Sequence, residues 1–220
     1  KPVITQEQID ELKEHLDDGN KIQILSALTR LRQICCDPHL IYENYKGQSA
    51  KLDTCMELIL SGVEAGHKIL LFSQFTSMLE LIGARMKKEG ISYYQLTGET
   101  SKEDRLKLVQ AFHKDETPVF LISLKAGGTG LNLTAADMVI HYDPWWNVAA
   151  QNQATDRAYR IGQEKPVTVY KLILKDTIEE NLLKLQNAKL ALAAQVVSEG
   201  MVSLGDLSQN ELMELFEQNP

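Results

Sequence analysis

Short apolar runs separated by amphipathic stretches fill the middle of this chain, and this alternation limits the fold more than any other feature. The apolar runs fall at residues 69–72, 92–96, 119–122, 138–142 and 167–173. Helical spacing of apolar residues occurs between them at 75–89, 101–113 and 148–160. Strands that are apolar throughout and are connected by helices form parallel sheets covered on both faces. The sequence therefore predicts a three-layer α/β domain with a mostly parallel sheet.

Further helical patterns flank the predicted sheet on both sides. They cover residues 5–17, 20–36 and 51–65 before the sheet, and 177–197 and 209–217 after it. Thr100 with Glu103, and Thr177 with Glu180, have the capping-box spacing that opens a helix. We therefore expect an N-terminal helical region (1–66), a sheet core (67–175), and a long helix followed by an acidic tail (176–220).

The charge of the chain is unevenly distributed. The net charge is −7, which by itself argues against a nucleic-acid-binding protein. Residues 68–165, however, carry a net charge of +1, and the acidity lies in the flanks. A neutral middle is compatible with a cleft that holds phosphates by backbone amides, hydroxyls and a few cations.

Two classes of protein are disfavoured by the residue pattern. The three cysteines, two of them adjacent and none spaced as CxxC, provide neither a disulfide framework nor a zinc site, and they indicate a reducing intracellular compartment. No apolar run reaches the ~18 residues that a bilayer span needs. The chain begins at Lys1 without Met, so we expect it to be a fragment of a longer protein.

Polar or small residues follow four of the predicted strands, at the edge where parallel α/β sheets bind ligands. They are Ser73, Gln74, Thr97, Gly98, Ser123, Lys125 and Asp143. The glycine-rich stretch 123–132 resembles a phosphate cradle, and a tight structural turn explains it equally well. No Walker A sequence and no complete dinucleotide fingerprint occur in the chain.

Gln153, Arg157 and Arg160 would lie on one face of the helix predicted over 148–160. Two arginines one turn apart suit phosphate oxygens, although a solvated basic face has the same spacing. The neighbouring Ala154 and Ala158 indicate a packed helix, which favours the phosphate interpretation.

Residues 69–163 closely resemble the C-terminal RecA-like lobe of the Swi/Snf ATPases, DNA translocases of helicase superfamily two. The resemblance is carried, in chain order, by ILLFSQF, LTGETSKEDR, LISLKAGGTGLNLTAADMVIHYDPWWN and QATDRAYRIGQ. LTRLRQICCDPHLI (28–41), SAKLD (49–53) and the long helix after Thr177 also resemble family elements. The adjacent tryptophans, Trp145 and Trp146, are typical of bacterial members.

This resemblance implies roles for individual residues. Arg157 and Arg160 match arginine fingers that act on the γ-phosphate of ATP, with Gln153, Gly128 and Gly130 near the nucleotide. The positions that match residues along the DNA backbone path are Ser73, Gln74, Thr97, Gly98, Ser123, Lys125 and Trp146.

The resemblance also implies a function for the parent protein: an ATP-dependent translocase or remodeller of double-stranded DNA. Its cofactors would be ATP and Mg²⁺, bound only in the complete two-lobe protein, and its partners would be the N-terminal RecA-like lobe and a DNA-bound complex such as RNA polymerase. No membrane is expected. The location would be cytoplasmic and nucleoid-associated in a bacterium, and nuclear in a eukaryote.

Two other functions are compatible with parts of the sequence. One is a non-catalytic RecA-like module that docks a protein through the acidic helix at 209–217. The other is a Rossmann-type cofactor enzyme that uses the glycine turn, although the end of the next strand lacks an acidic ribose ligand in a suitable context.

We expect the isolated chain to have no ATPase activity, because the Walker A lysine and the magnesium-binding carboxylates of the family belong to the other lobe. The measurement is ATP turnover by the purified chain with and without double-stranded DNA. Measurable DNA-stimulated ATP turnover by the highly purified chain would contradict the expectation.

Overall fold

The computed structural model of the 220-residue chain describes residues 21–127, 131–145, 147–160 and 162–195. Contacts divide the chain into two units, residues 50–173 and residues 1–49 with 174–220. The helices predicted over 5–17 and 209–217 lie outside the described residues. The domain boundaries expected after residues 66 and 175 stay a prediction.

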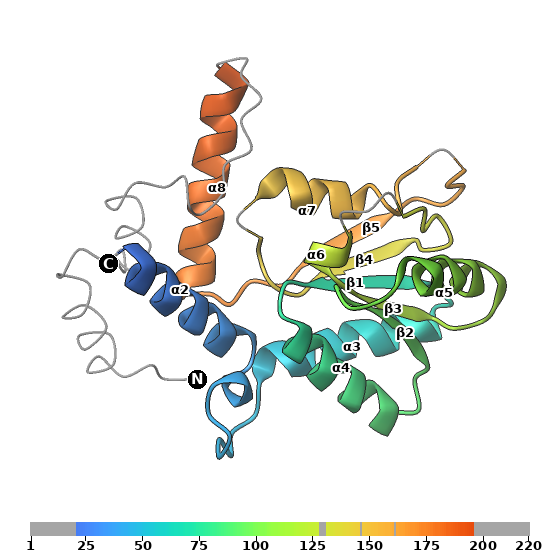
Figure 1. The fold of residues 1–220 in the computed structure, drawn as a ribbon, viewed down its shortest axis with the longest axis horizontal. Coiled ribbons are helices and arrows are strands. Elements are labelled where there is room, and N and C mark those ends of the chain that lie inside the picture. The colour runs from blue at the N-terminus through green and yellow to red at the C-terminus, as the bar shows by residue number, and fades with distance from the viewer. Residues whose placement is uncertain (1–20, 128–130, 146, 161, 196–220) are drawn as a thin grey trace. The chain divides into compact units, whose positions relative to one another are not determined.

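Residues 50–173 form an α/β unit around a five-stranded parallel sheet (Figure 1). The strands are β1 (Ile69–Ser73), β2 (Tyr93–Leu96), β3 (Val119–Ser123), β4 (Met138–His141) and β5 (Thr168–Lys171). Their order is β2-β3-β1-β4-β5, and all four pairings are parallel. In the register, Leu71 of β1 lies between Leu121 of β3 and Ile140 of β4. The five apolar runs of the sequence thus become the predicted parallel sheet.

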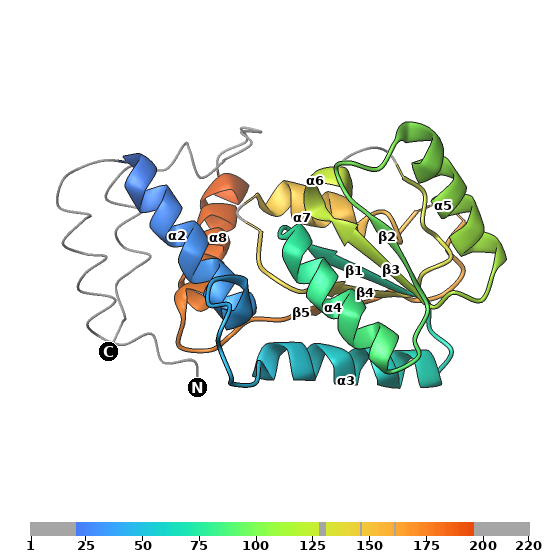
Figure 2. The same ribbon diagram turned by 60° about the horizontal axis from the view of Figure 1, so that its bottom comes forward.

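Helices lie on both faces of this sheet and cover its central strands, whereas every residue of the edge strand β5 is exposed (Figures 1 and 2). Helices α3 (Ala50–Glu64) and α4 (Thr76–Lys88) lie on one face, and α5 (Lys102–Lys114), α6 (Leu124–Gly127) and α7 (Val148–Thr155) on the other. Every residue of β1, β3 and β4 is buried, because the three central strands have a helical layer on each side. The three-layer prediction is confirmed.

The two faces of the sheet are packed differently, by a cluster with aromatic rings on one face and by a closely approaching helix on the other. On the α5 and α7 side, Leu70 and Phe72 of β1 join a cluster with Phe112 and Phe120, whose ring centroids are 5.3 Å apart. On the opposite side α3 approaches closely through Gly62. A Cβ at Gly62 would lie 2.8 Å from the Met138 sulfur, so a larger residue would require the Met138 side chain or α3 to shift.

The second unit contains α2 (Lys21–Cys36), the short 3-10 helix η1 (Pro38–Leu40) and α8 (Ile178–Gln195), with α2 packed against α8. Thr177 caps α8 by accepting a hydrogen bond from the Glu179 amide (3.2 Å), and Glu180 accepts from the Asp176 amide (2.9 Å). This is a variant of the predicted capping box. None of the described helices is both long and apolar enough to cross a membrane.

Helix α5 begins one residue later than its predicted capping box. Ser101, not Thr100, is the N-cap, and its hydroxyl accepts a hydrogen bond from the Asp104 amide at 3.1 Å. The Thr100 hydroxyl is used elsewhere, because it accepts from the Thr97 amide (3.0 Å) and closes the turn that follows β2.

Two polar residues close the sheet at the end opposite to the predicted ligand edge. The Lys68 ammonium donates to the carbonyls of Phe112 and Asp115, and so satisfies the end of α5. Asp137, 5% exposed, accepts from the Lys68 amide (3.1 Å) and from His67 Nδ1 (3.1 Å), and pairs with Lys165 at 3.4 Å. These contacts link the starts of β1 and β4.

The pKa of Asp137 is lower than its ordinary value. Burial is the largest single influence and raises the pKa, but the hydrogen bond and charge of His67, the charge of Lys165 and the Lys68 amide together lower it. A carboxyl group with a lowered folded-state pKa stabilises the fold above its unfolded pKa of ~3.9 and loses that contribution as the pH falls.

We therefore expect Asp137→Asn to destabilise the chain at pH 7 by about 1–3 kcal/mol. The difference from wild type should shrink as the pH falls below about 4. Urea titrations at a series of pH values measure both effects, with the exposed Glu64→Gln as the control. A difference that stays constant down to a pH of about 3 would contradict the role of the ionised carboxylate.

Candidate functional site

A buried hydrogen-bond network joins the carboxyl ends of β1 and β4. The Ser73 hydroxyl donates to Asp143 Oδ1 (2.6 Å), and the Gln74 amide donates to the same oxygen (3.2 Å). Ser73 also accepts from the Phe75 amide (3.2 Å), at the start of α4. Ser73 is fully buried, so its hydroxyl orients the chain after β1. The buried Nε2 of Gln74 has no hydrogen-bond partner among the described residues.

Thr97 and Gly98 lie in the turn that follows β2, also at the carboxyl edge of the sheet. Arg105 of α5 holds this turn from behind by donating to the carbonyls of Thr100 (2.9 Å), Gly98 (3.3 Å) and Thr97 (3.4 Å). Gly98 is exposed, and a Cβ built on it would meet no atom within 4 Å. The turn therefore presents an open surface.

The segment after β3 begins as a four-residue helix, α6, where the sequence predicts a glycine-rich turn. Buried Ser123 starts it by accepting a hydrogen bond from the Ala126 amide at 3.4 Å. The predicted site residues Gly128, Gly130 and Trp146, and the side chain of Lys125, lie outside the described part of the chain.

Helix α7 ends at Thr155, so the prediction of a helix over 148–160 is wrong in its last five residues. Gln153, Arg157 and Arg160 consequently do not share one helical face. Thr155 forms polar contacts both with the Gln151 carbonyl (3.3 Å) and with His141 Nε2 (2.9 Å), which holds the helix end against β4.

Residues 156–160, named here the arginine turn, follow this end. The Arg157 and Ala158 amides donate three residues back, to the carbonyls of Ala154 (3.2 Å) and Thr155 (3.1 Å), instead of continuing the α-helix. The Arg157 carbonyl accepts from the Leu133 amide (3.0 Å), which ties the arginine turn to the loop before β4.

His141 is neutral at physiological pH. Burial, together with the charge of neighbouring Lys171, lowers the pKa of His141 to about 4. Its Nε2 forms a hydrogen bond with the Thr155 hydroxyl (2.9 Å). His141 also stacks on Phe72 with ring centroids 5.5 Å apart. The residue thus acts as a neutral clamp between β4 and α7.

The two arginines of the turn have opposite environments. Arg157 is 1% exposed, and its Nε and Nη2 have no hydrogen-bond partner among the described residues. Arg160 is exposed. Burial lowers the pKa of Arg157, the nearby charge of Arg160 lowers it further, and Asp156 only partly opposes this. A buried cation with unpaired donors beside a second cation is a site that an anion would stabilise.

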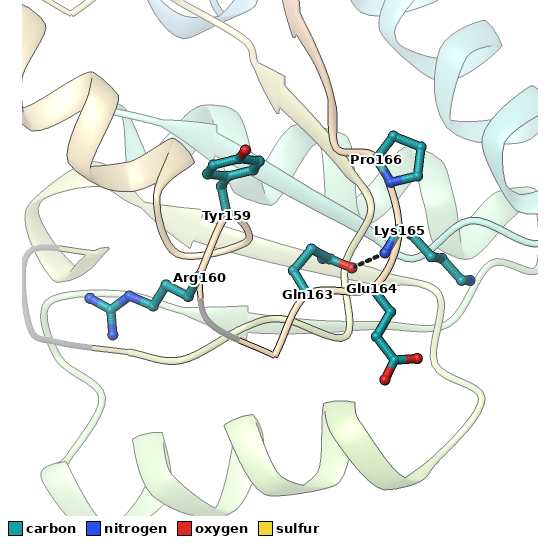
Figure 3. A pocket seen from close by; sticks show the side chains of 6 residues that line it. All are labelled: Tyr159, Arg160, Gln163, Glu164, Lys165 and Pro166. Carbon is teal, nitrogen blue, oxygen red and sulfur yellow. Dashed lines mark hydrogen bonds between the residues drawn. The ribbon is translucent and has the colours of Figure 1, made fainter.

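A cavity of about 720 Å³ lies next to the exposed arginine (Figure 3). Its lining residues are Tyr159, Arg160, Gln163, Glu164, Lys165 and Pro166. Tyr159 is 70% exposed, and Figure 3 shows the Arg160 side chain extending away from the other labelled residues. The lining contains two cations and one carboxylate, so a phosphate group fits better than a metal ion. No cluster of three potential metal-ligating side chains occurs in the described ranges.

Several residues that build this site were not given a role from the sequence. Asp143 organises the end of β1, His141 holds the end of α7, and Gln163 fastens the arginine turn through its carboxamide. The sequence does contain a signal for Asp143, because it is a polar residue directly after the apolar run 138–142. The contacts of His141 and Gln163 span 14 and 27 residues, respectively, and only the folded chain reveals them.

Comparison with known proteins identifies the family. The family described as "Helicase conserved C-terminal domain" matches residues 50–162. An uncharacterized ATP-dependent helicase of Mycoplasma pneumoniae is 40% identical over 213 residues, which is 95% of this chain and 20% of that protein. The chain spans about a fifth of the length of the curated relatives it matches.

Two solved structures from Sulfolobus solfataricus have the same fold. The SWI2/SNF2 ATPase C-terminal domain is 32% identical with a TM-score of 0.75, covering 96% of this chain and 90% of that one. The SWI2/SNF2 ATPase core in complex with dsDNA is 34% identical with a TM-score of 0.77, covering 96% of this chain and 46% of that one. The chain belongs to the helicase conserved C-terminal domain family and is a C-terminal RecA-like lobe of the Swi2/Snf2 ATPase type.

Proposed function

We propose that this chain is the second motor lobe of an ATP-dependent translocase or remodeller that acts on double-stranded DNA. In this role Arg157 and Arg160 bind the γ-phosphate of ATP held by a first lobe, and the carboxyl edge of the sheet grips the DNA backbone. The observation that carries the proposal is the arginine turn, where a buried guanidinium with unpaired donors lies near an exposed one.

The two arginines would contribute in different ways. Arg160 is exposed beside the cavity, so a phosphate can approach it without rearrangement of the lobe. Arg157 is covered, so its side chain has to become accessible before it can contact a ligand. A negative charge would relieve the mutual repulsion of the two cations, which makes this turn more stable with phosphate bound than without it.

ATP and Mg²⁺ fit this lobe only in part. The arginine turn offers donors for phosphate oxygens, with Gln153 of α7 exposed nearby in the chain. The described residues offer no carboxylate cluster for a metal ion, so its ligands would come from the first lobe. When bound there, Mg²⁺ neutralises phosphate charge. This lobe would orient the terminal phosphate and stabilise the charge that develops on it.

The DNA-binding part of the proposal rests on the polar carboxyl edge of the sheet. The turn at Thr97 and Gly98 is open and is held from behind by Arg105. Gln74 lies at the end of β1, on the same edge. Backbone amides, hydroxyls and small residues at such an edge contact phosphates without reading the sequence, so binding is expected to be salt-sensitive and sequence-independent.

Arg160→Ala in the full-length protein should lower the ATP turnover rate by a factor on the order of 10³ or more, because an arginine finger is worth that much in phosphoryl transfer. DNA affinity should stay within about threefold, since the side chain is not assigned to the DNA path. ATPase assays with saturating DNA and fluorescence anisotropy with a labelled duplex measure the two quantities.

Arg85→Ala is the matched control for this variant. Arg85 is an exposed arginine at the end of α4 that pairs only loosely with Asp53 (3.7 Å) and Glu89 (3.6 Å). It should leave both quantities unchanged. Equal losses of turnover and DNA affinity in Arg160→Ala would show that the residue is structural or contacts DNA, and would contradict the proposed role.

Gly98→Asp in the full-length protein should weaken duplex binding about tenfold or more at low salt, because it places a carboxylate against the DNA backbone. The free lobe has room for the side chain, and the backbone of Gly98 is not in the left-handed region, so thermal stability should change little. Anisotropy titrations over a range of salt concentrations measure the loss.

Gln110→Glu adds the same charge on the exposed face of α5, outside the predicted DNA path, and serves as the control. Its effect on DNA affinity should be less than about twofold. If the two variants weaken binding equally, the charge acts through the overall field of the lobe, and Thr97 and Gly98 do not contact DNA.

A further inference from the structure

The carboxamide of Gln163 binds backbone carbonyls from two different segments. Nε2 lies 2.7 Å from the Ala136 oxygen, 3.1 Å from the Thr134 oxygen and 3.2 Å from the Ala158 oxygen. Thr134 and Ala136 belong to the loop before β4, whereas Ala158 belongs to the arginine turn. One side chain therefore joins the arginine turn to the loop.

Gln163 also contacts the backbone next to the cavity. Its main-chain amide donates to the Arg160 carbonyl (2.9 Å). Its side-chain Oε1 accepts from the main-chain amide of Lys165 (2.9 Å), a contact drawn in Figure 3. Gln163 thus binds the Arg160 carbonyl with its main chain and the Ala158 carbonyl with its side chain. The arginine turn is thus attached to the loop directly at Arg157, through the bond from the Leu133 amide, and indirectly at Arg160, through Gln163.

This chemistry suits glutamine and few other side chains. The carboxamide supplies two N–H donors, which three carbonyls share, and one oxygen acceptor for the Lys165 amide. Ala136 and Ala158 are fully buried, so their carbonyl oxygens need donors from within the protein. A carboxylate in the same place would accept from Lys165 but would repel the three carbonyl oxygens.

The arginine turn needs such an anchor because α7 ends before it. No helical hydrogen-bond ladder fixes Arg160, and its side chain forms no hydrogen bond or ion pair with the described residues. An exposed arginine acts on a transferring phosphoryl group only when its backbone is held close to the productive position, and a displacement of about 1 Å can cost about 100-fold in rate.

We propose that Gln163 is a positioning residue for Arg160, which sets the place of the arginine turn without touching the nucleotide. The proposal rests on the role given to Arg160 under the proposed function. Replacement of Gln163 should lower kcat for ATP about 10- to 100-fold, while KM for ATP and duplex affinity stay within about threefold of wild type.

The test is a double-mutant cycle in the full-length protein with Gln163→Met, Arg160→Ala and the double variant. Methionine keeps the length of the side chain and removes its donors. If Gln163 acts through Arg160, the double variant should be no slower than Arg160→Ala alone. Gln110→Met, the same substitution on the exposed face of α5, is the control and should retain wild-type kcat.

Gln163→Glu is measured in parallel, together with the melting temperature of each variant. It keeps the shape and the acceptor for Lys165, so it reports on the donors even if the methionine variant does not fold. We expect its kcat to fall at least as far as that of Gln163→Met.

Wild-type kcat in a folded Gln163 variant would overturn the positioning role. Fully additive losses of kcat in the double variant would also overturn it, as would a rise in KM without a change in kcat. Each of these results would show that Gln163 affects turnover by a route other than Arg160. If Arg160→Ala itself keeps wild-type turnover, the proposed function fails first, and that result is distinguishable because it appears in the single variant without any change at Gln163.

Discussion

The burial of the parallel sheet on both faces is the constraint from which the site follows. β1, β3 and β4 have no residue that reaches solvent from within the strand, so polar chemistry on these strands is confined to their ends. One end is closed by Lys68, whose ammonium satisfies carbonyls at the end of α5, and by Asp137, which accepts a hydrogen bond from the Lys68 amide. The other end keeps Ser73, Gln74 and Asp143 beside the open turn at Gly98. The sheet therefore has a closed end and an end that carries the candidate binding residues, called here the binding end.

The binding end combines donors that are already satisfied with donors that are not. Ser73 and Arg105 use their polar atoms on the protein itself, where they set the direction of the chain after β1 and β2. Gln74 Nε2 and two nitrogens of Arg157 are buried without a hydrogen-bond partner among the described residues. Leaving buried donors unpaired costs free energy, about 1–3 kcal/mol for each group. An anion bound at these donors would offset that cost.

The strands and most helices could be predicted from the sequence because their signals are local. An apolar run such as residues 69–72 and the spacing of residues 75–89 each lie within a short window. The end of α7 could not be predicted in this way. At this end Thr155 contacts His141, a residue 14 positions earlier that the sheet holds in place through β4. The prediction that Gln153, Arg157 and Arg160 share one face assumed that the helix continues to residue 160. Because α7 ends at Thr155, helical spacing does not apply to the two arginines.

Ending the helix before the arginines has a mechanical consequence. In a helix, Arg157 and Arg160 would move as one rigid body with α7, and their spacing would be set by the helical rise. In a turn, their positions depend on separate attachments to the loop before β4, made by the Leu133 amide and by Gln163. That loop runs directly into β4, whose far end carries Asp143 and its bonds to Ser73 and Gln74. A displacement of the carboxyl ends of β1 and β4 can therefore reach the arginine turn through a short, continuous set of hydrogen bonds and chain segments. The proposed function requires such a connection between the carboxyl edge of the sheet and the arginine turn.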